Sequence, residues 1–177
     1  EVATATGLAR VIEPSALVRY DDSQYAQPGF GLSRFDASQP RHWVRAASVL
    51  EGVPAHVLAD CVCNPRAFDV SYRARLVTHA TTSGCASDVS LDTAILRATL
   101  ELVERDAFMR HWFAQRPGQG ISEPSLPPGA ASRLARLRDA GCAVGVACLD
   151  MGVHPTWLVW ATHDARHFTS IGTASGL

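Results

Sequence analysis

The chain has 177 residues, of which 47% are hydrophobic and 19% charged, and its formal net charge is −1. A near-neutral chain has no global attraction to nucleic acid or to an anionic membrane surface. No apolar run approaches the roughly 18 residues that a membrane-spanning helix needs. We therefore expect a globular protein whose residues 1–177 form one domain, with no nucleic acid and no membrane as partner.

The N-terminus is acidic and lacks the basic and apolar segments of a secretory signal peptide, so we expect a cytoplasmic protein. Its five cysteines are an odd number, which in that compartment indicates reduced thiols rather than disulfides. Cys61 and Cys63 lie two positions apart and would share one face of a strand. The other three stand among small or apolar residues and are expected to be buried: Cys85, Cys142 and Cys148.

The first half of the chain predicts loops followed by a hairpin. Residues 3–39 are interrupted by Pro, Gly and Asp, which predicts loops with short helical turns. Strong β-formers predict strands at 42–50 and 53–63, joined by a tight turn at Glu51-Gly52. The irregular stretch that follows predicts at most a short strand at 75–78.

Small residues fill the next segment, 81–90, and Gly84 lets its backbone approach a neighbour closely. Exposed N–H groups beside the start of a helix form a natural cradle for phosphate, and Ser83 and Gly84 stand at this place. An ordinary turn that leads into a helix explains the same residues, and the pattern alone favours this simpler interpretation.

A long helix is predicted over Leu91–Gln115, because no Gly or Pro interrupts it and Ser90 is a good N-cap residue. Asp92 adds a negative charge to the first turn, where the helix dipole favours it. Apolar residues recur at two helical rows, 95/98/102 and 96/100/103, which predicts a wide buried stripe.

The polar side of this helix carries Glu101 and Glu104, one turn apart. Two carboxylates so placed can share a divalent cation or bind two cations side by side, and Mg²⁺ prefers one or two carboxylates together with phosphate oxygens and water. Arg105 could bind a phosphate bidentately. Alternatively, Arg97–Glu101 and Glu101–Arg105 are i,i+4 pairs of opposite charge, typical of a solvated helix face, and the spacing alone favours this interpretation.

After a stop signal at Arg116-Pro117-Gly118, the pattern predicts a second helix and three strands. The helix is expected at 130–140, and the strands at 142–149, 156–162 and 168–172. The first strand is almost wholly apolar, so both of its faces should be covered. The whole pattern predicts an α+β domain with a long central helix packed on a largely antiparallel sheet.

Several short runs together resemble the YcaO family. They are Thr81-Thr82-Ser83-Gly84-Cys85-Ala86, then Ala94-Ile95-Leu96, then Glu101-Leu102-Val103-Glu104-Arg105-Asp106-Ala107, and Trp112. An isolated Glu-x-x-Glu-Arg run is common, but in this setting it is specific. The resemblance extends from about Trp43 to the end, and family members are longer, so we expect the middle portion of a YcaO-like domain.

This resemblance implies an ATP-dependent cyclodehydratase that uses ATP and Mg²⁺. Such proteins activate a backbone amide oxygen of a ribosomally made precursor peptide, so that a Cys, Ser or Thr side chain closes to an azoline ring. This chemistry makes thiazole/oxazole-modified peptides, including bacteriocins, and some relatives form a thioamide or an amidine instead. The implied partners are the precursor peptide, a leader-binding subunit and a second copy of the chain in a homodimer.

The resemblance implies that Glu101 and Glu104 are the ligands of Mg²⁺, and it assigns no catalytic residue. The implied ATP-binding residues are Glu101, Glu104, Arg105, Arg97, Ser83 and Gly84. The chain departs from the family pattern at Val89, Thr93 and Arg97, where Asn, Glu and Gln are frequent. Two functions therefore stay open: a peptide-modifying cyclodehydratase, and a non-catalytic YcaO-like scaffold that binds a precursor peptide or a partner subunit.

Overall fold

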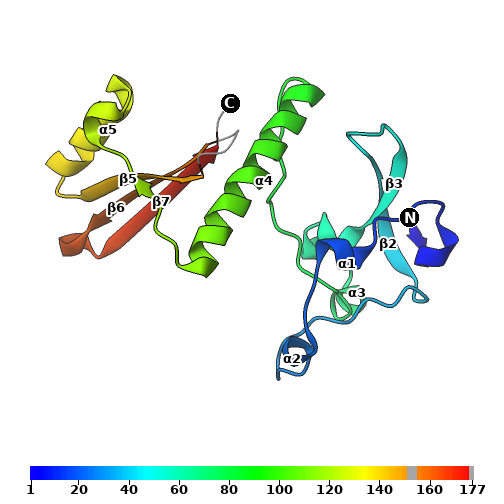
Figure 1. Cartoon of the computed structure of the whole chain (residues 1–177). Helices are drawn as coiled ribbons and strands as arrows, with labels where there is room; N and C mark the ends of the chain where they lie inside the picture. The colour runs from blue at the N-terminus through cyan, green and yellow to red at the C-terminus, as the bar shows by residue number, and fades with distance from the viewer. Residues whose placement is uncertain (151–154, 176–177) are drawn as a thin grey trace. The chain divides into compact units, whose positions relative to one another are not determined.

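The computed structural model describes residues 1–150 and 155–175 (Figure 1). The chain divides into two compact units, Glu1–Thr82 and Ser83–Leu177. Each unit has its own antiparallel sheet, of three strands in the first and four in the second. The single domain that the sequence predicts over 1–177 stays a prediction.

The sheet of the first unit contains β1 (Val2–Ala3), β2 (Arg41–Ala47) and β3 (Pro54–Leu58), in that order. The hairpin predicted from the sequence is confirmed as β2 and β3, although both strands are shorter than predicted. Its turn contains Gly52 with φ of 66°, a conformation that glycine adopts at little cost.

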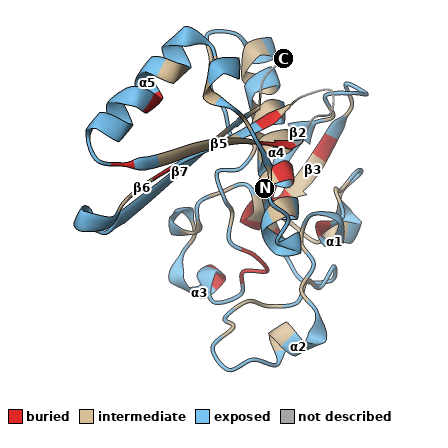
Figure 2. Cartoon of the chain, turned by 60° about the vertical axis from the view of Figure 1, so that its left-hand side comes forward, coloured by how far each residue is buried: buried red, intermediate tan, exposed pale blue. Residues whose placement is uncertain are grey.

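The apolar core of the first unit lies against this hairpin. Trp43 and Leu58 are directly paired across β2 and β3, and both pack with Val77. The indole N–H of Trp43 donates a 3.0 Å hydrogen bond to the carbonyl of Ala3, so the ring is both buried and satisfied. Figure 2 shows buried residues on both strands of the hairpin.

Three short helices occur in the loops of this unit: α1 (Pro14–Leu17), α2 (Asp22–Tyr25) and α3 (Val70–Arg73). The first two confirm the short helical turns that the sequence predicts within 3–39. Asp21 begins α2 with a capping box, in which its carboxylate accepts the N–H of Gln24 at 3.0 Å.

A buried polar network replaces the short strand predicted at 75–78. Asp60 is 1% exposed and accepts hydrogen bonds from the Tyr72 hydroxyl at 2.7 Å and the Val77 N–H at 2.9 Å. The guanidinium of Arg41 lies 4.0 Å from the same carboxylate. The backbone N–H of Val77 is therefore hydrogen-bonded to a buried side chain instead of to a neighbouring strand.

In the second unit, α4 (Leu91–Ala114) confirms the long helix to within one residue. Ser90 is its N-cap and accepts the N–H of Thr93 at 3.2 Å, as predicted. Gln115 ends the helix in the left-handed conformation with φ of 50°. Neither α4 nor any other helix within the described residues is long and apolar enough to cross a membrane.

The sheet of the second unit has the antiparallel order β4 (Gln119–Gly120), β5 (Ala143–Asp150), β6 (Thr156–His163) and β7 (Phe168–Ser175). Helix α5 (Pro128–Asp139) precedes β5, contacts it, and is exposed over most of its surface (Figure 2). The predicted helix and three strands are therefore all present, and the α+β class with a long helix and antiparallel sheet is confirmed.

The burial predicted for α4 is wrong in part. The helix contacts β5, β6 and above all β7 through one side, where Ala107 is buried and Leu100 and Val103 are half-buried. Leu96 and Leu102 are 40% and 51% exposed. A single sheet covers only one side of a helix, and each predicted row leaves one leucine exposed, Leu96 in one row and Leu102 in the other.

Cys142 and Cys148 are buried as predicted. Cys85 is exposed, contrary to prediction, because it lies in the loop before α4 rather than in a packed strand. Cys61 and Cys63 were expected to share one face of a strand, which is also wrong. The chain leaves β3 at Leu58 and enters a 3₁₀ turn before it reaches them.

Candidate functional site

One face of α4 brings together the three residues that the motif singles out. Glu101, Glu104 and Arg105 occupy positions i, i+3 and i+4 of an uninterrupted helix, so their side chains leave the backbone on the same side. Both glutamates are half-buried, and Arg105 is exposed. The helix thus presents two carboxylates and one guanidinium within about one turn.

Glu101 is tied to the loop before the helix. Its Oε2 accepts the N–H of Gly84 at 3.0 Å, and its Oε1 lies 3.6 Å from the guanidinium of Arg105. Gly84 has φ of 78°, and a Cβ there would come within 3.1 Å of the Leu102 side chain. Glycine at this position therefore allows both the turn and the close approach of the loop to α4.

Glu104 faces β7 instead. Its Oε1 accepts a hydrogen bond from the hydroxyl of Thr173. A pocket of about 410 Å³ opens beside this contact, lined by Glu104, Arg105 and Phe108 of α4 and by Ile171 and Thr173 of β7. A carboxylate and a guanidinium at the wall of a pocket can bind a cation and an anion side by side.

Arg97 does not join this group. Its Nε lies 2.9 Å from Oδ2 of Asp88, so the predicted Arg97–Glu101 pair is wrong. Asp88 stands in the loop just before the helix, where it can reach back to the first turns. The second predicted pair, Glu101–Arg105, is present. Thr93 shares a 2.8 Å hydroxyl contact with Ser90, so two of the three departures from the family pattern, Thr93 and Arg97, serve the start of α4.

The loop segment predicted to cradle phosphate is exposed at Ser83 and half-buried at Gly84. The N–H of Gly84 donates to Glu101, so this donor is engaged within the protein. Among the described residues, no group of three or more His, Cys, Asp or Glu side chains is gathered to hold a metal ion. Two carboxylates nevertheless suit Mg²⁺, which takes its remaining ligands from phosphate and water.

Sequence reasoning did not identify Thr173 or Asp88. Thr173 stands 69 positions after Glu104, and nothing in the local pattern says which strand residue faces the helix. The period of two along a strand does place Ile171 and Thr173 on one face. This alternation would point to Ile171 and Thr173 as neighbours of Glu104 only once the packing of β7 against α4 is known.

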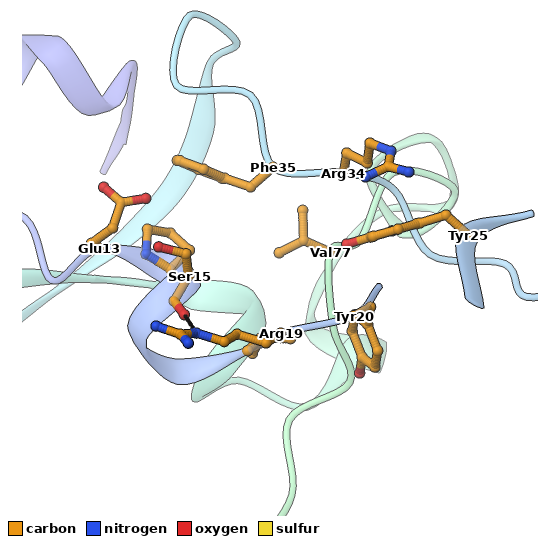
Figure 3. A pocket seen from close by; sticks show the side chains of 10 residues that line it. Glu13, Ser15, Arg19, Tyr20, Tyr25, Arg34, Phe35 and Val77 are labelled. Carbon is orange, nitrogen blue, oxygen red and sulfur yellow. Dashed lines mark hydrogen bonds between the residues drawn. The ribbon is translucent and has the colours of Figure 1, made fainter. Parts of the chain in front are cut away.

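A second hollow, of about 560 Å³, lies in the first unit (Figure 3). Aromatic and cationic side chains line it, among them Arg19, Tyr20, Tyr25 and Arg34. The Arg34 guanidinium pairs with Asp22 at 2.7 Å and lies 4.2 Å from the centre of the Tyr25 ring. The Nε–H of Arg19 donates to a backbone carbonyl at 3.0 Å. None of these residues belongs to the motif, so the candidate site stays on α4.

The site thus consists of a long helix with a Glu-x-x-Glu-Arg face that packs on an antiparallel sheet. The family described as YcaO cyclodehydratase, ATP- and Mg²⁺-binding, matches residues 1–177. The chain belongs to the YcaO family, as the resemblance predicts. The cofactors expected from the sequence, ATP and Mg²⁺, are those of the family's description. A comparison with curated proteins finds no match.

Solved structures share this fold. The heterocyclase TruD superposes with a TM-score of 0.79 at 20% identity, over 99% of this chain and 27% of TruD. The Escherichia coli microcin synthetase McbBCD complex with pro-MccB17 bound gives 0.69 at 17% identity, over 99% of this chain and 45% of the other.

A third structure is YcaO from Methanopyrus kandleri bound with AMPPCP and Mg²⁺. It gives a TM-score of 0.60 at 19% identity, over 84% of this chain and 40% of that one. The chain thus spans between about a quarter and less than half of these proteins, which fits the expectation of a partial domain. At identities this low, the superpositions show a common fold alone.

Proposed function

We propose that the protein of this chain is an ATP-dependent cyclodehydratase that activates backbone amides of a ribosomally synthesised precursor peptide and forms azoline rings from Cys, Ser or Thr. Membership of the YcaO family supports the general chemistry. Related folds include a heterocyclase in complex with substrate and cofactor, at 21% identity, and the McbBCD complex with pro-MccB17.

The observation that carries this proposal is the shared face of Glu101, Glu104 and Arg105, with the last two at the wall of one pocket. Glu101 and Glu104 would hold Mg²⁺, because their oxygens are the ligands that this cation prefers. Arg105 would contact a phosphate oxygen, a role that falls to arginine here because the chain has no lysine. Ser83, Gly84 and Arg97 would border the phosphates.

The chemistry needs a leaving group where the amide oxygen stands. Bound ATP supplies a phosphoryl group for that oxygen, so the net change is loss of one water from the peptide and hydrolysis of one ATP. The residues of this chain would neutralise the phosphate charge and hold the reacting groups in line, the two contributions that dominate phosphoryl transfer.

The expected assembly follows from the same proposal. The substrate is a precursor peptide, a partner subunit presents its leader, and two copies of the chain form a homodimer in the cytoplasm. The McbBCD structure is a complex of several subunits with a pro-peptide, which supports a partner subunit and a peptide substrate for this protein.

One observation favours the alternative, a non-catalytic scaffold that binds a precursor peptide or a partner subunit. Both oxygens of Glu101 already have partners, the N–H of Gly84 and the guanidinium of Arg105. A carboxylate engaged in this way can serve the fold alone, and an exposed pair of this kind contributes about 0–1 kcal/mol.

ATP turnover in the full-length protein separates the two functions. With a precursor peptide present, we expect ATP hydrolysis that depends on the peptide and loss of one water per ring by mass spectrometry. Arg97→Gln restores the residue frequent in the family and should preserve or raise this turnover. Peptide binding without any ATP turnover or mass change, in the parent and in Arg97→Gln, would establish the scaffold instead.

A further inference from the structure

Thr173 lies outside the family motif, yet it touches the motif directly. Its hydroxyl donates to Oε1 of Glu104, and both residues line the 410 Å³ pocket. Within the described part of the chain, Glu104 has this hydroxyl as its hydrogen-bond partner. The contact joins β7 to α4 across 69 positions of sequence.

The strand holds this hydroxyl firmly. β7 pairs with β6 over its whole length, and Thr173 stands opposite Leu158 in the register. Threonine is branched at Cβ, so its χ1 angle has few alternatives on a strand. Ile171, on the same face, lines the pocket with Thr173, and Phe108 closes the helix side. The side chain that meets Glu104 is therefore fixed by its strand.

We infer that Thr173 is a positioning residue for the Mg²⁺ site. This inference rests on the function proposed above. Its hydroxyl occupies Oε1 of Glu104 and leaves Oε2 for the cation. Carboxylates that bind metals are commonly oriented by such outer hydrogen bonds, whose removal weakens metal binding about 10- to 100-fold. Glu101 is oriented differently, by the N–H of Gly84 and the guanidinium of Arg105.

The test measures how much Mg²⁺ the full-length protein needs to bind ATP, by calorimetric titration of ATP at stepped MgCl₂ concentrations. Thr173→Val keeps the shape and removes the hydroxyl, and it should raise the half-saturating Mg²⁺ concentration about 10- to 100-fold. Thr173→Ser keeps the hydroxyl and should stay within about threefold of the parent. Thr169→Val is the matched control, because Thr169 lies on β7 but is exposed and away from the pocket.

The comparison of Thr173→Val with Thr173→Ser isolates the effect of the hydroxyl that donates to Oε1 of Glu104. If Thr173→Val loses thermal stability but needs no more Mg²⁺ than the parent protein, the inference is overturned and the proposed function stands. A parent protein that binds no ATP with Mg²⁺ would overturn both.

Discussion

At the scale of single residues, Glu101 and Glu104 have different partners although the motif treats them alike. Glu101 meets a backbone N–H and the guanidinium of Arg105. Glu104 meets one hydroxyl and borders a pocket. A carboxylate that already faces a cation has less charge to offer another, so we expect Glu104 to contribute more to cation binding and Glu101 to order the loop as well.

A residue-scale prediction concerns Cys61. Burial, together with the neighbouring charge of Asp60, raises the pKa of its thiol from the ordinary 9.0 to about 11. The thiolate is the reactive form, so iodoacetamide at pH 8 should label Cys61 much more slowly than the exposed Cys85. Peptide mapping by mass spectrometry gives both rates in one experiment.

The same raised pKa has a consequence for stability. The folded protein holds the Cys61 thiol neutral, so this contribution is complete below the unfolded pKa of 9.0 and is lost as pH rises toward about 11. Cys61→Ala should reduce the fall in melting temperature between pH 9 and 11. Equal labelling of Cys61 and Cys85 in the folded protein would show that the thiol is neither shielded nor raised in pKa.

At the scale of elements, the sequence predicted those features that depend on near neighbours. Ser90 caps α4, and Gly52 closes the hairpin, because each acts within a few residues of its own position. The strands of the second sheet follow their β-forming residues in the same way. The sequence predicted a largely antiparallel sheet, but it did not predict the order of the strands in it.

Contacts that span long stretches of sequence could not be predicted. The partner of Arg97 depends on how the loop at Asp88 folds back, and the partner of Glu104 depends on the position of β7. The two apolar rows of α4 both satisfy the helical period, so the pattern could not tell which residues of each row meet the sheet. The candidate site residues were proposed from the motif, and their partners became known only from the structure.

A prediction at this scale concerns Gly145 on β5, which stands opposite Trp160 of β6. A Cβ at Gly145 would lie 2.5 Å from atoms of the Trp160 ring, far inside normal contact. Gly145→Ala should therefore displace the ring and destabilise the protein by about 1–3 kcal/mol. The midpoint of urea unfolding measures this change.

Gly172→Ala is the matched control, on β7 of the same sheet. A Cβ at Gly172 would meet nothing within 4 Å, so this variant should be neutral or slightly stabilising. A Gly145→Ala variant as stable as Gly172→Ala would mean that the indole of Trp160 moves aside freely, and that β5 and β6 pack less tightly than the structure indicates.

At the scale of the whole molecule, α4 presents large apolar side chains to solvent near its C-terminal end. Met109, Trp112 and Phe113 are 42%, 63% and 77% exposed. Exposed apolar clusters commonly mark interaction surfaces. We predict a homodimer that buries this cluster, so Phe113→Lys should shift the protein toward monomer in light scattering. Leu50→Lys, at a residue 97% exposed in the first unit, is the control.

A monodisperse monomer of the parent protein that is stable on heating would contradict the dimer. A dimer that Phe113→Lys leaves unchanged would place the interface elsewhere. Either outcome leaves the proposed chemistry standing, since the pocket at Glu104 is built from residues of one chain.

The proposed function requires that Glu101 and Glu104 hold Mg²⁺ for ATP. Glutamine keeps the size and hydrogen bonding of glutamate but removes the charge that Mg²⁺ requires. Calorimetric titration of ATP into the full-length protein with Mg²⁺ should show binding in the parent, and Glu101→Gln and Glu104→Gln should each abolish it. Their melting temperatures should stay close to that of the parent, because ion pairs at partly exposed positions contribute little to stability. Two folded variants that bind ATP with Mg²⁺ as tightly as the parent would contradict the metal assignment and leave the scaffold as the function.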